Sequence, residues 1–89
     1  MAYIPKKVAD SFVATEIDDE VVVLRLTDGD IFSMTGTSRE IWDRIDGQTS
    51  CAAIADELSA LHAAARDSVA EDVSSFVAEL RDEGLVDLV

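Results

Sequence analysis

A tight turn at residues 27–30, Thr-Asp-Gly-Asp, separates two apolar segments and constrains the fold more than any other feature of the sequence. Asp-Gly pairs adopt the positive φ values that hairpin turns require. The segment before the turn, residues 20–26, is β-branched and almost continuously apolar. Such a run is typical of a strand buried on both faces. Residues 31–34 are then expected to return as the next strand of an antiparallel hairpin.

An alternating segment precedes this hairpin and predicts a further strand. Residues 11–18 alternate in side-chain type, and Asp18-Asp19 supplies a turn into the buried segment. Alternation is typical of a strand with one covered face. The sequence therefore predicts a three-stranded antiparallel meander with residues 20–26 in the middle and residues 31–34 at one edge. Three strands cannot bury both faces alone, so helices must cover one of them.

The first helix is predicted from a start signal followed by helical spacing. Thr37 and Glu40 have the spacing of a capping box, in which each side chain satisfies a free backbone amide at the helix start. Ile41, Trp42 and Ile45 follow on one face. Asp46-Gly47 ends this helix, because glycine readily adopts the left-handed conformation after a last turn.

Two more helices follow. Thr49 is expected to cap the second, Ser68 and Glu71 form a capping-box pattern for the third, and Gly84 ends it. Residues 85–86 are expected to fold back on the last turn. The predicted apolar stripes are Cys51, Ile54, Ala55, Leu58, Leu61 and His62 on the second helix, and Val69, Val73, Phe76, Val77 and Leu80 on the third, with Val77 wholly in the core.

The element order predicts an α+β fold: a three-stranded antiparallel sheet followed by three helices. The second and third helices, joined by a short connector, resemble a helix-turn-helix, and the hairpin alongside makes the arrangement winged-helix-like. The 89 residues suit one domain, residues 1–89, with residues 1–10 as an irregular lead-in.

The charge of the chain restricts its partners. Nineteen acidic residues against seven lysines and arginines give a net charge of −12, which disfavours nucleic acids and anionic membranes. The third helix would be the recognition helix of a DNA-binding protein, yet Arg81 is its only base among five acids. No apolar run approaches the roughly 18 residues of a membrane span. The N-terminus lacks a secretory signal. We therefore expect a cytoplasmic protein.

The sequence contains no catalytic or metal-binding pattern. His62 and Cys51 are the only residues of their types, so paired metal ligands are lacking, and neither a cofactor nor a metal is expected. Cys51 is expected to pack as a small apolar residue. Trp42 is expected in the core, with ligand stacking as the alternative. We expect that the protein is not an enzyme and acts through a binding surface.

The candidate surface is the edge formed by residues 31–34. Proteins usually protect an exposed strand edge with proline, lysine or a bulge, but this segment contains neither charge nor proline. Such an edge can accept an extended peptide as an additional strand. Two alternatives remain at this point: the edge is covered by the chain's own termini, or by a second copy.

The region from Glu20 to Val86 resembles the PqqD superfamily, whose members recognise the precursors of ribosomally made, modified peptides. The residues that carry the resemblance are Val21-Val22-Val23-Leu24, Asp28-Gly29, Ile31-Phe32-Ser33-Met34, Ile41-Trp42-Asp43-Arg44-Ile45-Asp46-Gly47, Thr49, Ile54-Ala55-Asp56-Glu57-Leu58, Asp72-Val73, Phe76, Leu80 and Gly84-Leu85-Val86. Each motif is degenerate, but their order and spacing together are fairly specific.

The resemblance implies that the leader segment of a precursor peptide adds as a strand beside residues 31–34 and lies against the third helix. It implies a partner enzyme, such as a leader peptidase, a cyclase or a radical SAM enzyme, in a lasso-peptide or PqqD-type pathway. The protein itself would be a monomer or a weak homodimer. The peptide-binding residues carried over by position are Ile31, Phe32, Ser33, Met34, Asp72, Val73, Phe76, Glu79, Leu80 and Glu83.

Helical spacing does not decide which of Val73, Phe76 and Leu80 face the groove. Asp72, Glu79 and Glu83 are expected to pair with basic leader residues. The alternative functions are a winged-helix module for protein interaction or transcriptional regulation, and a homo-oligomeric structural module.

Overall fold

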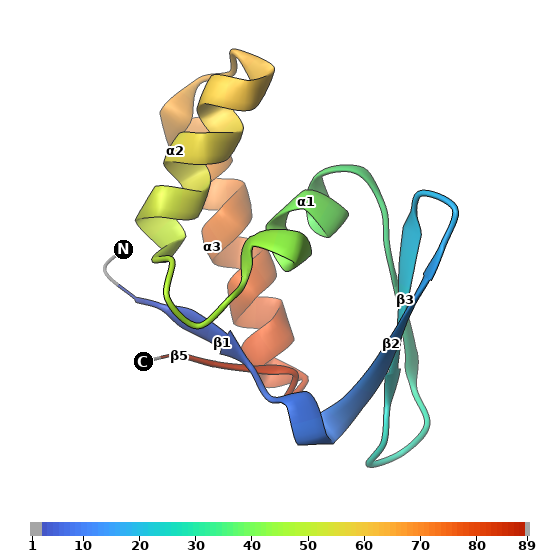
Figure 1. The fold of residues 1–89 in the computed structure, drawn as a ribbon. Coiled ribbons are helices and arrows are strands. Elements are labelled where there is room, and N and C mark those ends of the chain that lie inside the picture. Colours follow the sequence, from blue (N-terminus) through green and yellow to red (C-terminus); the bar gives the residue numbers. More distant parts are fainter. Residues whose placement is uncertain (1–2, 89) are drawn as a thin grey trace.

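The computed structural model describes residues 3–88, which fold into two small sheets and three α-helices (Figure 1). The predicted order of three strands followed by three helices is confirmed, and a short strand is added at each end. The elements are β1 (Pro5–Lys7), a 3-10 helix η1 (Ala9–Ser11), β2 (Phe12–Ile17), β3 (Glu20–Arg25), β4 (Ile31–Met34), α1 (Gly36–Arg44), α2 (Cys51–His62), α3 (Arg66–Asp82) and β5 (Val86–Leu88).

The larger sheet has the predicted antiparallel order β2-β3-β4, with β3 in the middle. Its register pairs Val23 of β3 with Ala14 of β2 and Phe32 of β4. The expectation that β3 is buried on both faces is wrong. Val21 and Val23 are buried, whereas Leu24 is 37% exposed. All three helices lie on one side of the sheet, so the other side faces solvent (Figure 1).

Strand β2 is more exposed than its alternating pattern predicts. Among its six residues only Phe12 is partly buried, and its ring packs edge-on against Trp42 with 5.2 Å between ring centroids. The remaining five residues are exposed. Alternation therefore located this strand correctly, although most of the strand has no covered face.

The helix starts differ from the sequence predictions. Helix α1 begins at Gly36 with Thr35 in the cap position, and no side chain caps it. Glu40 does not close a capping box, because its carboxylate contacts Nε2 of His62 at 2.9 Å. Helix α2 is capped by Ser50, not Thr49: the Ser50 hydroxyl accepts a bond of 3.1 Å from the amide of Ala53.

Helix α3 begins earlier than its predicted capping box. Its first residue is Arg66, and neither Ser68 nor any other side chain caps it. The guanidinium of Arg66 donates to the carboxylate of Asp56 on α2 at 2.6 Å and to the carbonyl of Ala52. These contacts with α2 extend the start of α3, so tertiary structure set this boundary.

The core lies between the sheet and the helices. Trp42 and Cys51 are buried in it as expected, and burial raises the pKa of the Cys51 thiol. Val77 is also in the core, as predicted. Leu61 and His62 are wrong members of the predicted stripe, because they lie exposed at the end of α2. The buried hydrophobic residues are Val21, Val23, Met34, Ile41, Trp42, Ile45, Cys51, Ile54, Ala55, Leu58, Val73, Val77, Leu80, Leu85 and Val86.

The two ends of the chain form the second sheet. The prediction of an irregular lead-in is wrong for residues 5–7, which pair antiparallel with β5; residues 1–2 lie outside the described residues. Residues 86–88 accordingly form a strand, in addition to the expected return of Leu85 onto the last turn, where its amide donates to the Leu80 carbonyl at 2.9 Å. The amide of Gly47 donates to the Pro5 carbonyl at 3.2 Å. Strands β1 and β5 therefore pair with each other next to the helices.

Candidate functional site

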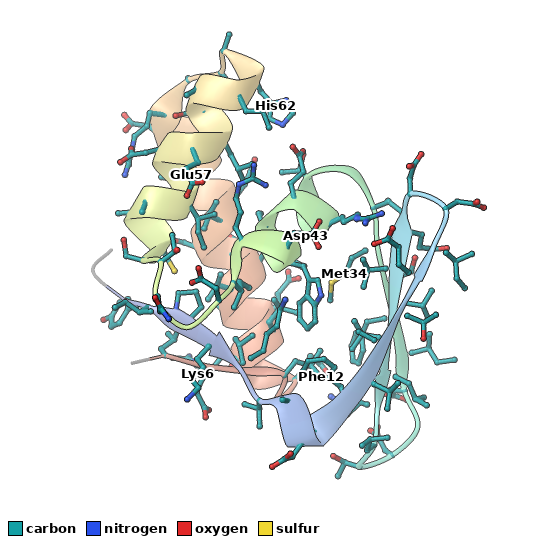
Figure 2. The ribbon with its side chains drawn as sticks, in the orientation of Figure 1. Lys6, Phe12, Met34, Asp43, Glu57 and His62 are labelled. Carbon is teal, nitrogen blue, oxygen red and sulfur yellow. The ribbon has the colours of Figure 1, made fainter. Side chains whose placement is uncertain are left out.

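A groove of about 510 Å³ runs between β4 and α3. One wall is the edge strand, and the other is the face of α3 turned towards it. Figure 2 shows Met34 pointing from the sheet towards the helices, which places its side chain at the base of this region. The groove is lined by Ile31, Phe32, Ser33, Met34, Ser38, Phe76, Glu79, Leu80 and Glu83.

The register shows which backbone groups of β4 point outwards. The amide of Arg25 donates to the carbonyl of Asp30 at 2.8 Å, so this pair is hydrogen-bonded. Hydrogen-bonded and non-hydrogen-bonded pairs alternate along an antiparallel ladder. With the observed register, Phe32 and Met34 direct their backbone groups towards β3. The amides and carbonyls of Ile31 and Ser33 therefore point to the open side.

The open side of β4 is unpaired within residues 3–88, because β3 is the only strand that pairs with it there. The chain ends do not cover it, since β1 and β5 pair with each other. This finding removes one of the two alternatives left by the sequence, that the chain's own termini cap the edge. The free amides of Ile31 and Ser33 thus face the groove side as donors for an added strand.

The opposite wall comes from α3. Phe76, Leu80 and Glu83 recur three to four residues apart, a spacing that places them on one helix face. Phe76 is partly buried and Leu80 is almost wholly buried, so both form an apolar wall that is already held by the core. Glu79 is exposed beside them.

Two of the ten site residues predicted from the sequence do not line the groove. Val73 is fully buried in the core and does not line the groove, whereas Phe76 and Leu80 do. Helical spacing had left open which of these three residues face the groove. Asp72 is exposed on α3 but outside the groove. The other eight are brought together. Ser38, which sequence reasoning missed, also lines the groove; its position in the first turn after β4 is the signal that could have indicated it.

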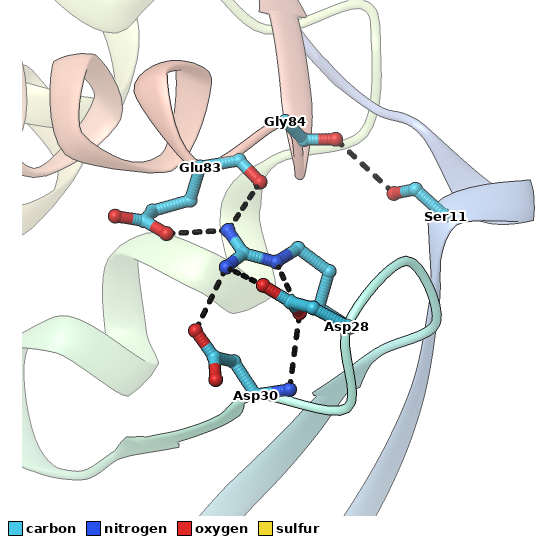
Figure 3. A network of polar contacts seen from close by, with 6 residues as sticks. Ser11, Asp28, Asp30, Glu83 and Gly84 are labelled. Carbon is cyan, nitrogen blue, oxygen red and sulfur yellow. Dashed lines mark hydrogen bonds and ion pairs between the residues drawn. The ribbon is translucent and has the colours of Figure 1, made fainter.

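An ion-pair network around Arg25 joins the two walls at one end of the groove (Figure 3). The guanidinium of Arg25 donates to both the carboxylate and, at 2.9 Å, the backbone carbonyl of Glu83, the residue that caps the C-terminus of α3. It also bonds Asp28 at 2.7 Å and Asp30 at 2.9 Å in the β3–β4 turn. It lies 5.2 Å from the centre of the Phe32 ring. One side chain therefore fixes the spacing of helix, turn and edge strand.

The network changes the acid–base properties of its members. The hydrogen bonds from Arg25 and from the amide of Asp30 lower the pKa of Asp28 to about 2. Hydrogen bonds that Arg25 donates to the carboxylates of Asp28 and Glu83 raise the pKa of Arg25 above its usual value. Asp28 and Arg25 are therefore charged at neutral pH. By formal charge the corner has three carboxylates around one guanidinium, those of Asp28, Asp30 and Glu83 around Arg25.

The three acidic residues expected to pair with lysines or arginines of a leader differ in their position and in their present partners. Glu83 is already paired with Arg25, and Asp72 lies outside the groove. Among residues 3–88, Glu79 is the groove acid whose side chain has no hydrogen-bond or ion-pair partner. The groove therefore combines apolar side chains, two serines and the paired Glu83 with one free carboxylate, that of Glu79.

The described residues include no cluster of histidine, cysteine, aspartate and glutamate that could hold a metal ion. Over the same span, no helix is both long and apolar enough to cross a membrane.

Comparisons with known proteins agree with this geometry. The model of the family described as coenzyme PQQ synthesis protein D (PqqD) matches residues 20–86. A solved structure described as TbiB1 in complex with the TbiA(beta) leader peptide superposes with a TM-score of 0.82 and 29% sequence identity. The superposition covers 92% of this chain and 94% of that one. No curated protein matches the sequence. Because the family model spans most of the chain, from β3 to β5, the protein belongs to the PqqD family.

Proposed function

We propose that the protein binds the leader segment of a ribosomally synthesised precursor peptide as an additional strand beside β4 and presents it to peptide-modifying enzymes. The observation that carries the proposal is the unpaired edge of β4 beside the apolar wall of α3. The solved relative, TbiB1, is in complex with a leader peptide, and this chain shares its fold over nearly its whole length.

The backbone of β4 supplies the sequence-independent part of the interaction. An incoming strand pairs with the outward amides and carbonyls of Ile31 and Ser33, which extends the ladder from three strands to four. Each such bond has a net value of about 1 kcal/mol, because it replaces bonds to water. Pairing alone therefore gives weak binding with little selectivity.

The side chains of the groove supply the selective part. Alternate side chains of an added strand point to the same face, so every second leader residue is directed towards Phe76 and Leu80. The affinity of a peptide that orders on binding depends on a few buried anchors. Glu79 attracts a lysine or arginine at the solvent side of the same groove. We expect a leader with spaced apolar residues and one base near them.

The proposed role is non-catalytic presentation. The partner enzyme is a leader peptidase, a cyclase or a radical SAM enzyme, and the cognate pathway is of the lasso-peptide or PqqD type. Ribosomal precursors are made in the cytoplasm, so the proposal places the protein there. A single domain of this size presents the peptide by holding its leader while the remainder of the peptide stays free.

The test is NMR spectroscopy of the labelled protein titrated with a synthetic leader, taken from the precursor peptide whose gene neighbours that of this chain. The amide resonances of Ile31 and Ser33 are expected to shift, and their hydrogen exchange is expected to slow. Ala14 and Glu16 of β2 serve as internal controls, because their outward amides lie at the other edge of the sheet. Saturable binding that leaves Ile31 and Ser33 unchanged contradicts the proposal.

A further inference from the structure

The side of the larger sheet that faces away from the helices carries an apolar patch. Val13, Leu24 and Ile31 are direct neighbours across the three strands and are 52%, 37% and 68% exposed. Val22 adjoins them in the next row, and Ile17 of β2, also 52% exposed, extends the patch. We call this set the outer patch. Apolar side chains gathered on an uncovered face indicate a contact surface more strongly than scattered ones do.

Both ends of the outer patch are acidic. Asp18, Asp19 and Glu20 lie at the β2–β3 turn, and Asp28 and Asp30 lie at the β3–β4 turn. Between residues 12 and 34 the chain has six acids and one base, Arg25. Arg25 pairs with Asp28 and Asp30 and with Glu83 beside α3, so the excess of negative charge is largest at the β2–β3 turn. A second copy stacked face to face would bring acidic turns against acidic turns in either orientation. The charge therefore favours a different partner, with an apolar patch flanked by lysines or arginines.

The outer patch is continuous with the groove. Ile31 belongs to both, because it lines the groove and also ends the row that runs from Val13 through Leu24. A peptide strand paired with β4 places half of its side chains on the same outer face, next to Ile31. The loaded sheet thus offers a wider patch than the empty one. This step rests on the proposed function.

We propose that the outer patch is the docking surface for the enzyme that acts on the bound peptide, recognised through an apolar patch that lysines or arginines flank. The leader then contributes to the surface that the enzyme contacts. The enzyme binds the loaded protein more tightly than the empty protein, because only the loaded sheet has the fourth strand.

The experiment measures binding of each purified peptide-modifying enzyme encoded beside this chain, by interferometry, with and without the synthetic leader. The test variant is Val13→Thr/Leu24→Thr, which keeps strand-forming residues and removes apolar surface. Its matched control is Leu61→Thr, because Leu61 is 60% exposed on α2, away from the patch. A second test variant is Asp19→Lys, at the acidic end of the patch, and its matched control is Glu71→Lys on α3.

We expect Val13→Thr/Leu24→Thr to weaken enzyme binding by about tenfold or more, as for loss of a central interface contact. Asp19→Lys is expected to weaken it by a smaller factor, and both control variants are expected to match the wild type. Addition of leader is expected to tighten binding of the wild type. Calorimetry with leader alone is expected to give equal affinities for the wild type and Val13→Thr/Leu24→Thr, which separates this proposal from leader binding itself.

Several outcomes overturn the docking proposal. Unchanged enzyme binding by Val13→Thr/Leu24→Thr excludes the outer patch, and so does the absence of binding by every neighbouring enzyme. Sedimentation that shows a wild-type dimer dissociating in this variant assigns the patch to a second copy. If the wild type binds enzyme through the patch but binds no leader, the docking surface stands and the proposed function fails.

Discussion

The larger sheet has two edges, and they differ in what lies beside them. Both β2 and β4 pair only with β3 among the described residues. Both leave backbone groups directed outwards: those of Ile31 and Ser33 on β4, and those of Ala14 and Glu16 on β2. Beside β4, however, α3 provides an apolar wall and closes a groove. Strand β2 is exposed beyond Phe12.

The two edges are also held differently. Arg25 joins β4 and its turn to α3, whereas Arg39 of α1 reaches Glu16 on β2 at 2.6 Å and the carbonyl of Asp18. The first arginine fixes the width of a groove, and the second one ties down a solvent-exposed strand. The comparison shows that unpaired backbone groups alone do not make a binding site. A wall of side chains at a fixed distance is also needed to select the strand that binds.

The largest expected effect comes from removing one outward amide at each edge. Ser33→Pro deletes a donor that the added strand requires, yet leaves the ladder to β3 intact, because the Ser33 amide points away from it. We expect leader affinity to fall about tenfold or more, from the lost bond and the bulk of the ring. Ala14→Pro is the matched variant at β2 and is expected to leave the calorimetric affinity unchanged.

If Ala14→Pro weakens leader binding as much as Ser33→Pro does, the two edges are equivalent and the comparison fails. Circular dichroism of both variants checks that the fold persists.

The next effect concerns the apolar wall. Phe76→Ala removes a partly buried ring from the groove and is expected to weaken leader binding by about 1 kcal/mol or more, roughly fivefold. Val13→Ala removes an exposed apolar side chain of β2 and is expected to have no effect on leader affinity. Calorimetry measures both. An unchanged affinity for a folded Phe76→Ala variant would exclude Phe76 from the site.

A smaller effect is expected from the two arginines. Arg25→Ala releases Glu83, Asp28 and Asp30, so the groove loses its fixed width and leader affinity is expected to fall by a few-fold. Arg39→Ala releases β2 from α1 and is expected to leave leader affinity unchanged. Both variants are expected to melt below the wild type. Equal losses of affinity would show that overall stability, and not groove width, controls binding.

The smallest effect is a pH dependence at the turn beside β4. The pKa of Asp28 is about 2 in the folded protein, below its usual value of 3.8, so its ionised form stabilises the fold. This contribution is present above about pH 4 and is lost as the pH falls through about 2. Asp28→Asn is therefore expected to melt below the wild type at pH 7, and the difference is expected to shrink as the pH falls below 4 and to vanish below about pH 2. The matched variant is Asp19→Asn in the β2–β3 turn. The side chain of Asp19 makes no hydrogen bond among the described residues, so this variant is expected to have a smaller effect on the melting temperature at pH 7.

Local sequence predicted the elements of the fold well where each one had its own chemical signal. The Asp-Gly turn, the β-branched run and the apolar spacing of α3 correctly located β3, β4 and the third helix. Helix starts were predicted poorly: Ser50, and not its neighbour Thr49, caps α2, and α3 begins at Arg66, whose guanidinium bonds Asp56 on α2. The strands β1 and β5 were missed, since each has only three residues and exists only through pairing with the other.

The candidate site also has one part that local sequence predicted and one part that it did not. Its strand was predicted from an uncharged, proline-free segment at the end of a meander, which is a local property of residues 31–34. Its helix wall was predicted only as a set of alternatives. Val73 and Phe76 are three residues apart and both apolar, and no sequence pattern distinguishes the one that is buried from the one that lines the groove. The position of the helix relative to the strand made that choice.

By itself, therefore, the sequence determined the meander, its last edge strand and the acidic character that disfavours phosphate-rich partners, because turn chemistry, strand propensity and charge are properties of short segments. Tertiary structure decided which side chains face the groove, paired Glu83 with Arg25 and left Glu79 as the free acid of the groove among residues 3–88. The physical reason is that these outcomes depend on the distance between α3 and β4. That distance is set by the packing of the whole core and by one arginine that spans the gap.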